Sequence, residues 1–183
     1  MAYLTYIIDN YNSSLPSTIA FLHSHRNGFL RAWHTDSPLH DNVDAIRALQ
    51  IPFVSRNGYV NLRCNWNPGC GRHSTNEHVT PTVWEELFND TSTPPMDDAG
   101  RWKSSMADAV SPKEDREKAM YLRGHTAAAC CAQFAVSKEQ VLKRPVEDYI
   151  TFRDWVIHTE KNDAKSGRVM EYVWHVIFGK DSV

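Results

Sequence analysis

The chain has 183 residues, 42% of them hydrophobic, and a formal net charge of −2. This length favours one domain over residues 1–183, and the small charge excludes a global positive field that would attract nucleic acid. No apolar run is long enough for a signal peptide or a membrane span, so we expect a cytoplasmic protein without membrane contact.

The first half of the chain predicts helices and strands in alternation. Residues 2–11 place apolar side chains at helical spacing, and residues 18–22 are typical of a short buried strand. Residues 23–26 follow this strand at its carboxyl end. In open α/β sheets, ligands bind at the carboxyl ends of the strands. Asp41 is typical of a helix cap, with its helix running to residue 50, and residues 59–62 predict a second strand.

The second half of the chain predicts one further strand among helices. Helix starts are expected at Thr80 and Ser111, each followed by proline. A core strand is expected over 126–136, then a helix capped by Ser137, and then helices over about 146–160 and 167–178. Together these elements predict a single α/β domain with a short mixed or parallel sheet flanked by helices.

Cysteines and common motifs predict neither a metal nor a cofactor. We expect the four cysteines, Cys64, Cys70, Cys130 and Cys131, to be reduced and buried, because a cytosolic setting disfavours disulfides. Cys64, Cys70, His73 and His78 fit no zinc-finger spacing. The chain also lacks the glycine-rich phosphate loops and the Gly-x-Ser-x-Gly elbow.

The last predicted helix carries a narrow polar stripe. Arg168, Glu171 and His175 are spaced i, i+3 and i+7, while the rest of the helix surface is almost entirely apolar. A buried carboxylate beside arginine and histidine must be paired, and such pairing is how enzymes tune an acid or a base. The alternative is a surface stripe with an Arg168–Glu171 ion pair.

Ionisable residues also cluster after the first predicted strand. Loops at strand ends often carry functional sites, which favours a site at this cluster, composed of His23, His25, Arg26, His34, Asp36 and Asp41. The alternative is one or two capped turns with a solvated histidine. In the second strand, alternation places Tyr59, Asn61, Arg63 and Asn65 on one face, which either meets a ligand or is an exposed edge.

Several longer segments, read together, resemble a fungal family catalogued as a domain of unknown function. The resemblance covers nearly the whole chain and rests on YLTYIIDNY (3–11), FLHSHR (21–26), WH (33–34), GYVNLRC (58–64) with PGC (68–70), CAQFAVS (131–137) and GRVMEYVWH (167–175). Family members carry an amino-terminal strand region and a Gly-Arg-Glu-Ala-like segment, where this sequence has only Met1 and Ala2.

The resemblance implies a Rossmann-like or glycosyltransferase-like layout. It also implies an arginine-containing cyclodipeptide synthase, which joins arginine to a second amino acid as a diketopiperazine in secondary metabolism. The expected partners are arginyl-tRNA and a second aminoacyl-tRNA. Two alternatives stay open: a glycosyltransferase-like enzyme using a nucleotide sugar, and a non-catalytic binding protein.

Aminolysis of aminoacyl esters requires a base and positioned donors. We expect Glu171 to be the base with His175 beside it, and Arg26 or His34 to stabilise the oxyanion. A guanidinium substrate needs a carboxylate, which Asp36, Asp41 or Asp44 can offer. The other expected substrate contacts are His23, His25, Tyr59, Asn61, Arg63, Gln133 and Arg168, with Ser24 as a candidate nucleophile. Expected tRNA phosphate contacts are Lys138, Lys143 and Arg144.

Overall fold

The computed structural model describes residues 1–28, 35–63, 78–88, 126, 128, 129 and 131–180. Its elements in chain order are α1 (Ala2–Asn10), β1 (Thr18–Phe21), the 3-10 helix η1 (Pro38–His40), α3 (Asn42–Arg47), α4 (Ile51–Asn57), β2 (Tyr59–Asn61), α5 (Pro81–Phe88), β3 (Phe134–Ser137), α7 (Lys138–Val141), α8 (Val146–His158) and α9 (Asp163–Ile177).

The described strands form one antiparallel sheet with β3 in the middle. Phe134 lies opposite both Phe21 of β1 and Asn61 of β2, and Val136 lies opposite Tyr59. The predicted mixed or parallel sheet is therefore wrong, because β3 runs back between β1 and β2 and pairs antiparallel with each of them. A Rossmann-like layout is not confirmed. As a result, β1 and β2 finish at the same end of the sheet, where β3 begins.

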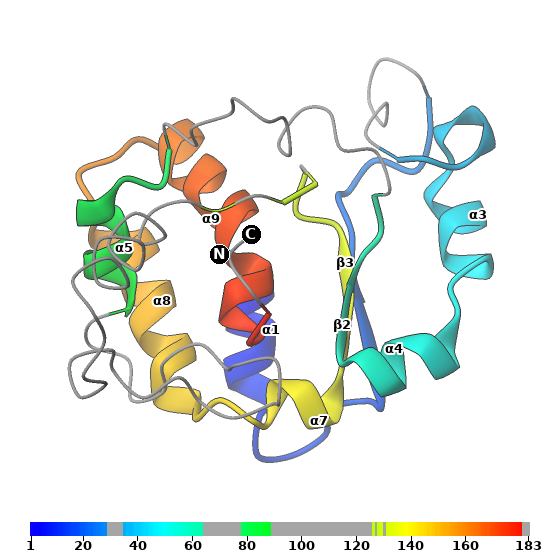
Figure 1. The fold of residues 1–183 in the computed structure, drawn as a ribbon, viewed down its shortest axis with the longest axis horizontal. Helices are drawn as coiled ribbons and strands as arrows, with labels where there is room; N and C mark the ends of the chain where they lie inside the picture. The colour runs from blue at the N-terminus through cyan, green and yellow to red at the C-terminus, as the bar shows by residue number, and fades with distance from the viewer. Residues whose placement is uncertain (29–34, 64–77, 89–125, 127, 130, 181–183) are drawn as a thin grey trace, which may run out of the picture.

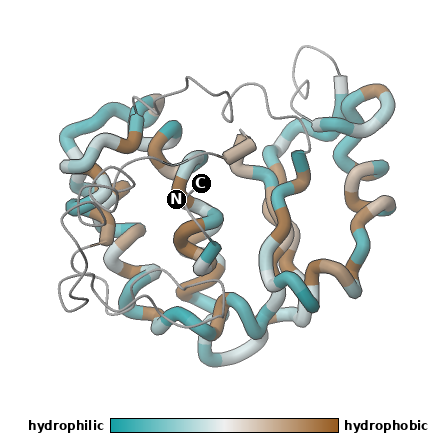
Figure 2. The backbone as a smooth tube through the Cα atoms, viewed as in Figure 1, coloured by the Kyte–Doolittle hydropathy of each residue, from teal (hydrophilic) through white to brown (hydrophobic). Residues whose placement is uncertain are grey.

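Helices cover both faces of this sheet (Figure 1). Alternation along the strands directs Phe21, Tyr59 and Phe134 to one face, where α1 and α9 pack, with α8 and α5 beyond them. The opposite face meets α4. The ring of Trp174 in α9 packs at a tilt against that of Phe134 with centroids 5.2 Å apart, and Figure 2 shows hydrophobic segments along the strands and α9.

Most predicted elements are confirmed within a few residues, and their caps explain the boundaries. The Asp41 carboxylate accepts from the Val43 N–H at 2.7 Å, and the Ser137 hydroxyl accepts from the Gln140 N–H at 3.2 Å. The helix after Asp41 ends early, at Arg47, and a separate helix, α4, follows it.

Two predicted boundaries are wrong. The strand expected over 126–136 begins only at Phe134, because Cys131 and Ala132 have positive φ, which interrupts extended backbone. Helix α9 begins at Asp163, four residues before the predicted start, because the Asn162 side chain accepts from the Lys165 N–H at 3.0 Å. The helix expected after Ser111 lies outside the described residues.

A buried ion pair joins the turn after α7 to α8, and its arginine also binds α9. Arg144 Nη1 lies 2.7 Å from Asp148 Oδ2, with side chains 1% and 3% exposed, and Arg144 Nε donates to the Ile177 carbonyl at 2.8 Å. Burial lowers the pKa of Arg144, and the Asp148 carboxylate opposes that shift. Since this guanidinium cannot reach a phosphate, the predicted tRNA contact at Arg144 is wrong.

Among the described helices, none combines the length and the apolar character that crossing a membrane requires.

Candidate functional site

His23 lies two residues after the end of β1, at the end of the sheet where β3 begins. The His23 N–H donates to Gln133 Oε1 at 3.0 Å, and Gln133 Nε2 donates to the Thr35 hydroxyl at 3.3 Å. Thr35 in turn donates to Asn42 Oδ1 at 2.7 Å, and Asn42 Nδ2 donates to the His25 carbonyl at 2.6 Å. Gln133 is 2% exposed, so it orients the chain around His23 instead of contacting a ligand as predicted.

A cavity of about 380 Å³ lies beside His23, between the amino ends of α1 and α9. We call it the acidic cavity because two carboxylates, Asp163 and Glu171, line it together with Ser166 and Ala132. Its aromatic wall consists of Tyr3 and Trp174. Burial raises the pKa of Tyr3 to about 12, so its phenol is neutral at physiological pH.

The environment of His23 favours the neutral imidazole. Desolvation by burial lowers the pKa of His23, and His25 lowers it further. The Glu171 carboxylate and a hydrogen bond with the Cys131 backbone raise the pKa, but the net shift is downward. A neutral imidazole facing a cavity is able to accept a proton from a bound ligand.

The polar stripe of α9 divides between the cavity and the core. Arg168 Nη1 lies 2.9 Å from Glu171 Oε2, with side chains 54% and 19% exposed, so the ion pair foreseen as the alternative to a catalytic stripe is formed at the cavity wall. His175, one turn further along α9, is 8% exposed and does not line the acidic cavity. The imidazole that accompanies Glu171 in the acidic cavity is that of His23.

The backbone beside the acidic cavity is strained. Cys131 and Ala132 have φ of 91° and 46°, in the left-handed region that residues other than glycine rarely occupy. Such residues cluster at active sites and ligand clamps. Cys131 is also disulfide-bonded, so the prediction of reduced cysteines is wrong for this residue.

The three aspartates expected to bind a guanidinium are engaged elsewhere. Asp36 Oδ1 lies 3.9 Å from Arg63 Nε, whose side chain is 3% exposed. Asp41 caps α3, and Asp44 Oδ1 lies 3.5 Å from Arg47 Nη1. None of the three lines the acidic cavity.

The strand residues expected to contact substrate are also structural. Tyr59 is 6% exposed and stacks on Phe178 with ring centroids 5.6 Å apart. Asn61 Nδ2 donates to the Ala129 carbonyl at 3.0 Å, and Arg63 is buried with Cys131 Sγ 3.4 Å from its Nη1. These side chains support the edge of the sheet from within.

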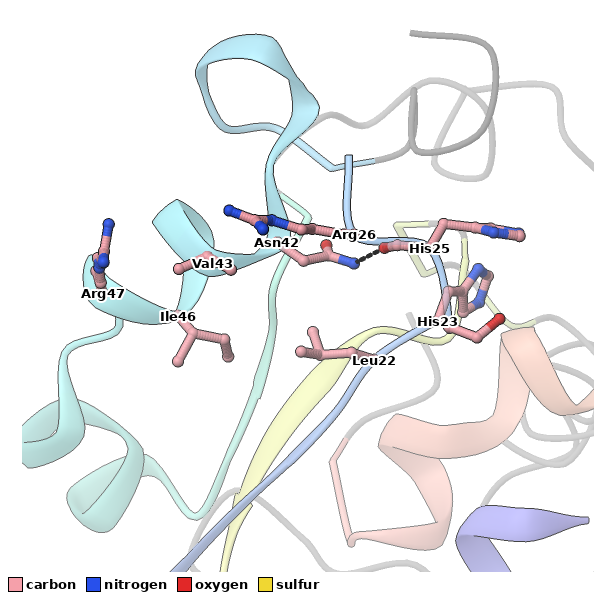
Figure 3. A pocket seen from close by; sticks show the side chains of 9 residues that line it. Leu22, His23, His25, Arg26, Asn42, Val43, Ile46 and Arg47 are labelled. Atoms are coloured by element: carbon pink, nitrogen blue, oxygen red, sulfur yellow. Dashed lines mark hydrogen bonds between the residues drawn. The ribbon is translucent and has the colours of Figure 1, made fainter. Parts of the chain in front are cut away.

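A second cavity, of about 390 Å³, lies on the other side of His23 (Figure 3). It is lined by Leu22, His23, Ser24, His25, Arg26, Asn42, Val43, Ile46 and Arg47. The structure thus brings together His23, Ser24, His25 and Arg26 of the predicted cluster. His34 and Asn65 lie outside the described residues.

Sequence reasoning missed Asp163, Ser166, Trp174 and Tyr3 as cavity residues. For Asp163, a signal was present in Asn162-Asp163, which is typical of a helix cap followed by an acid in the first turn. The late predicted start of the last helix placed Asp163 outside it.

No group of three or more His, Cys, Asp or Glu side chains converges as metal ligands within the described part of the chain. Of the four residues weighed for zinc, Cys64, Cys70 and His73 lie outside that part. The fourth, His78, has its ring centroid 6.1 Å from that of Tyr172.

The family model described as "Protein of unknown function (DUF3431)" matches residues 1–183, so the chain belongs to the DUF3431 family. No curated protein and no solved structure matches the chain.

Proposed function

We propose that this member of the DUF3431 family is a transferase that forms an arginine-containing cyclodipeptide from arginyl-tRNA and a second aminoacyl-tRNA. The acidic cavity is its active site. One observation carries the proposal: the desolvated imidazole of His23 and the carboxylates of Asp163 and Glu171 line the same cavity. The resemblance to arginine-containing cyclodipeptide synthases supplies the substrates.

The reaction requires three proton movements for each amide bond. The α-ammonium of one aminoacyl ester loses a proton, and the free amine attacks the ester carbonyl of the other. A C–N bond forms, the attacking nitrogen loses a second proton, and the C–O ester bond breaks. The departing ribose oxygen gains one proton, so one proton per amide bond is released to solvent. Repetition of these steps within the dipeptidyl ester closes the diketopiperazine ring.

His23 is the base in this proposal. The lowered pKa keeps its imidazole neutral near pH 7, so it is ready to accept a proton from the attacking nitrogen and to deliver it to the departing ribose oxygen, while the other nitrogen proton is released to solvent. The Glu171 carboxylate favours the imidazolium that forms between these two steps. This role of Glu171 replaces the one expected from sequence, in which Glu171 itself was the base.

Asp163 is the proposed partner of the arginine side chain. Within the part of the chain that the structure describes, its carboxylate takes part in no hydrogen bond or ion pair, and it lines the acidic cavity. A guanidinium prefers a carboxylate partner and an aromatic face, and Trp174 and Tyr3 offer such faces across the cavity.

The lysines expected to contact tRNA stand far from this cavity in the fold. Lys138 begins α7 directly after β3 ends, and Lys143 follows α7, whereas His23 lies at the edge where β3 begins. Lys143 is exposed and Lys138 half-buried, so both stay candidates for contacts with the body of a tRNA. The phosphates nearest the reacting ester need cations closer to His23.

The proposal is tested by incubating the purified protein with arginyl-tRNA and a set of other aminoacyl-tRNAs, and by analysing the products by mass spectrometry. We expect a cyclo-Arg-Xaa product, and a loss of about 10²–10⁴-fold in its rate for His23→Ala, the usual contribution of a general base.

His158→Ala is the matched control. His158 is an exposed histidine in α8 that is hydrogen-bonded to the Asp154 carbonyl at 2.8 Å, outside both cavities. If folded wild-type protein gives no arginine diketopiperazine, or if His23→Ala retains the rate of His158→Ala, the proposal is wrong.

A further inference from the structure

The second cavity, which we call the basic cavity, differs from the acidic cavity in charge and shares His23 with it. We infer that it binds the 3′-terminal nucleotide of the aminoacyl-tRNA, with the terminal phosphates on Arg26 and Arg47. This inference rests on the proposed function, since it names the subsite for the carrier of the acyl group.

The floor of the basic cavity is apolar. Leu22, at the exit of β1, faces Ile46 of α3 across the cavity, and Val43 lies beside Ile46 (Figure 3). Aliphatic side chains suit the apolar face of a nucleobase, which they contact through dispersion. A floor of this kind does not itself attract phosphate, so the charges on the rim decide the ligand class.

Two guanidinium groups stand on that rim. The side chains of Arg26 and Arg47 are 74% and 76% exposed. Arg26 Nε lies 3.9 Å from Asp41 Oδ2, and Arg47 Nη1 lies 3.5 Å from Asp44 Oδ1. Direct charge-assisted hydrogen bonds are shorter, about 2.7–2.9 Å, so donors on both guanidinium groups stay open to a phosphate.

The carboxylates beside these arginines do not prevent a phosphate from binding them. Asp41 directs Oδ1 to the Val43 N–H at 2.7 Å, where it caps α3. Exposed ion pairs such as Arg47–Asp44 contribute about 0–1 kcal/mol, so a phosphate with bidentate geometry competes with them.

Charge separation around His23 matches the two ends of an arginyl ester. The cationic side chain belongs with Asp163 and Glu171 in the acidic cavity, and the phosphates belong with Arg26 and Arg47 in the basic cavity. His23 borders both cavities, so the ester that links the two ends lies beside the proposed base.

The inference is tested by titrating the protein with the 5′-phosphorylated dinucleotide pCpA, which has the last two nucleotides of a tRNA. A nucleotide sugar is titrated separately for comparison. We expect pCpA to bind more tightly than the nucleotide sugar, and its affinity to fall at least about tenfold for each of Arg26→Ala and Arg47→Ala, as for a charged hydrogen bond. Added salt should weaken the wild-type affinity more than that of the double variant.

Arg56→Ala is the control, because Arg56 is an exposed arginine of α4 outside both cavities. Unchanged pCpA affinity in the double variant overturns the inference, and so does tighter binding of the nucleotide sugar. This assay needs no turnover. Loss of pCpA affinity without cyclodipeptide formation therefore refutes the proposed function alone, and synthesis with unaltered pCpA affinity refutes this inference alone.

Discussion

Removal of the Asp148 carboxylate should strongly destabilise the protein, because it breaks a buried ion pair. The Arg144–Asp148 pair is almost completely buried, and Arg144 also donates to the carbonyl of Ile177 at the end of α9. Asp148→Ala leaves a guanidinium in the core without its carboxylate, and breaking a buried pair in this way costs about 3–5 kcal/mol.

This cost converts into a large change in melting temperature. For a chain of 150–250 residues, each kcal/mol shifts Tm by roughly 2–4 °C, so Asp148→Ala should lower Tm by roughly 6–20 °C. The measurement is thermal unfolding followed by circular dichroism, with urea unfolding as a second readout. The acidic cavity and His23 are not touched by this substitution.

Asp154→Ala is the matched control on the same helix. Asp154 Oδ1 lies 3.7 Å from Arg153 Nε with side chains 49% and 27% exposed, and a pair of this exposure contributes about 0–1 kcal/mol. The double variant Arg144→Met with Asp148→Leu should recover part of the loss, but the Ile177 carbonyl still lacks its donor, at about 1–3 kcal/mol. Equal Tm values for Asp148→Ala and Asp154→Ala would refute this account.

Three other predictions concern the site and its support. The rate of product formation should rise with pH through a midpoint below 6.5, because the lowered pKa of His23 means that the active neutral form is lost only in more acidic solution. Glu171→Gln should move that midpoint lower still, and a midpoint above 6.5 in the wild type would contradict the assignment. Gly58→Ala should lower the free energy of unfolding by about 1–3 kcal/mol in urea, because Gly58 has φ of 80° and an added Cβ would lie 2.2 Å from Gln140 Oε1. Gly28→Ala, with positive φ but open space around it, is its comparison and should cost less. Cys131→Ser should lower stability by about 2–4 kcal/mol and slow product formation, since the disulfide constrains the strained turn beside the cavity. Alkylation with and without dithiothreitol, read by mass spectrometry, checks the bond itself, and a fully alkylated Cys131 without reductant would contradict it.

Local sequence patterns predicted most of the described elements. Periodicity identified α1, β1 and β2, and the cap residues Asp41 and Ser137 marked helix starts that the structure confirms. Such signals act within a few residues, because a helix cap or an alternating strand needs only its immediate neighbours. The same reasoning found His23 and Glu171 as ionisable residues worth attention, without pairing them.

Tertiary structure decided the strand order and the membership of the site. The hydrogen bond from the His23 N–H to Gln133 joins residues 110 positions apart, and no local pattern encodes it. Burial excludes Arg144 and Tyr59 from the ligand contacts that their residue types suggested, because both side chains lie in the core. The sequence by itself determined most of the helices and strands and which side chains are ionisable. Only the packing of α1, α9 and the antiparallel sheet decided which of those side chains share a cavity, because desolvation and charge pairing depend on distant segments brought together.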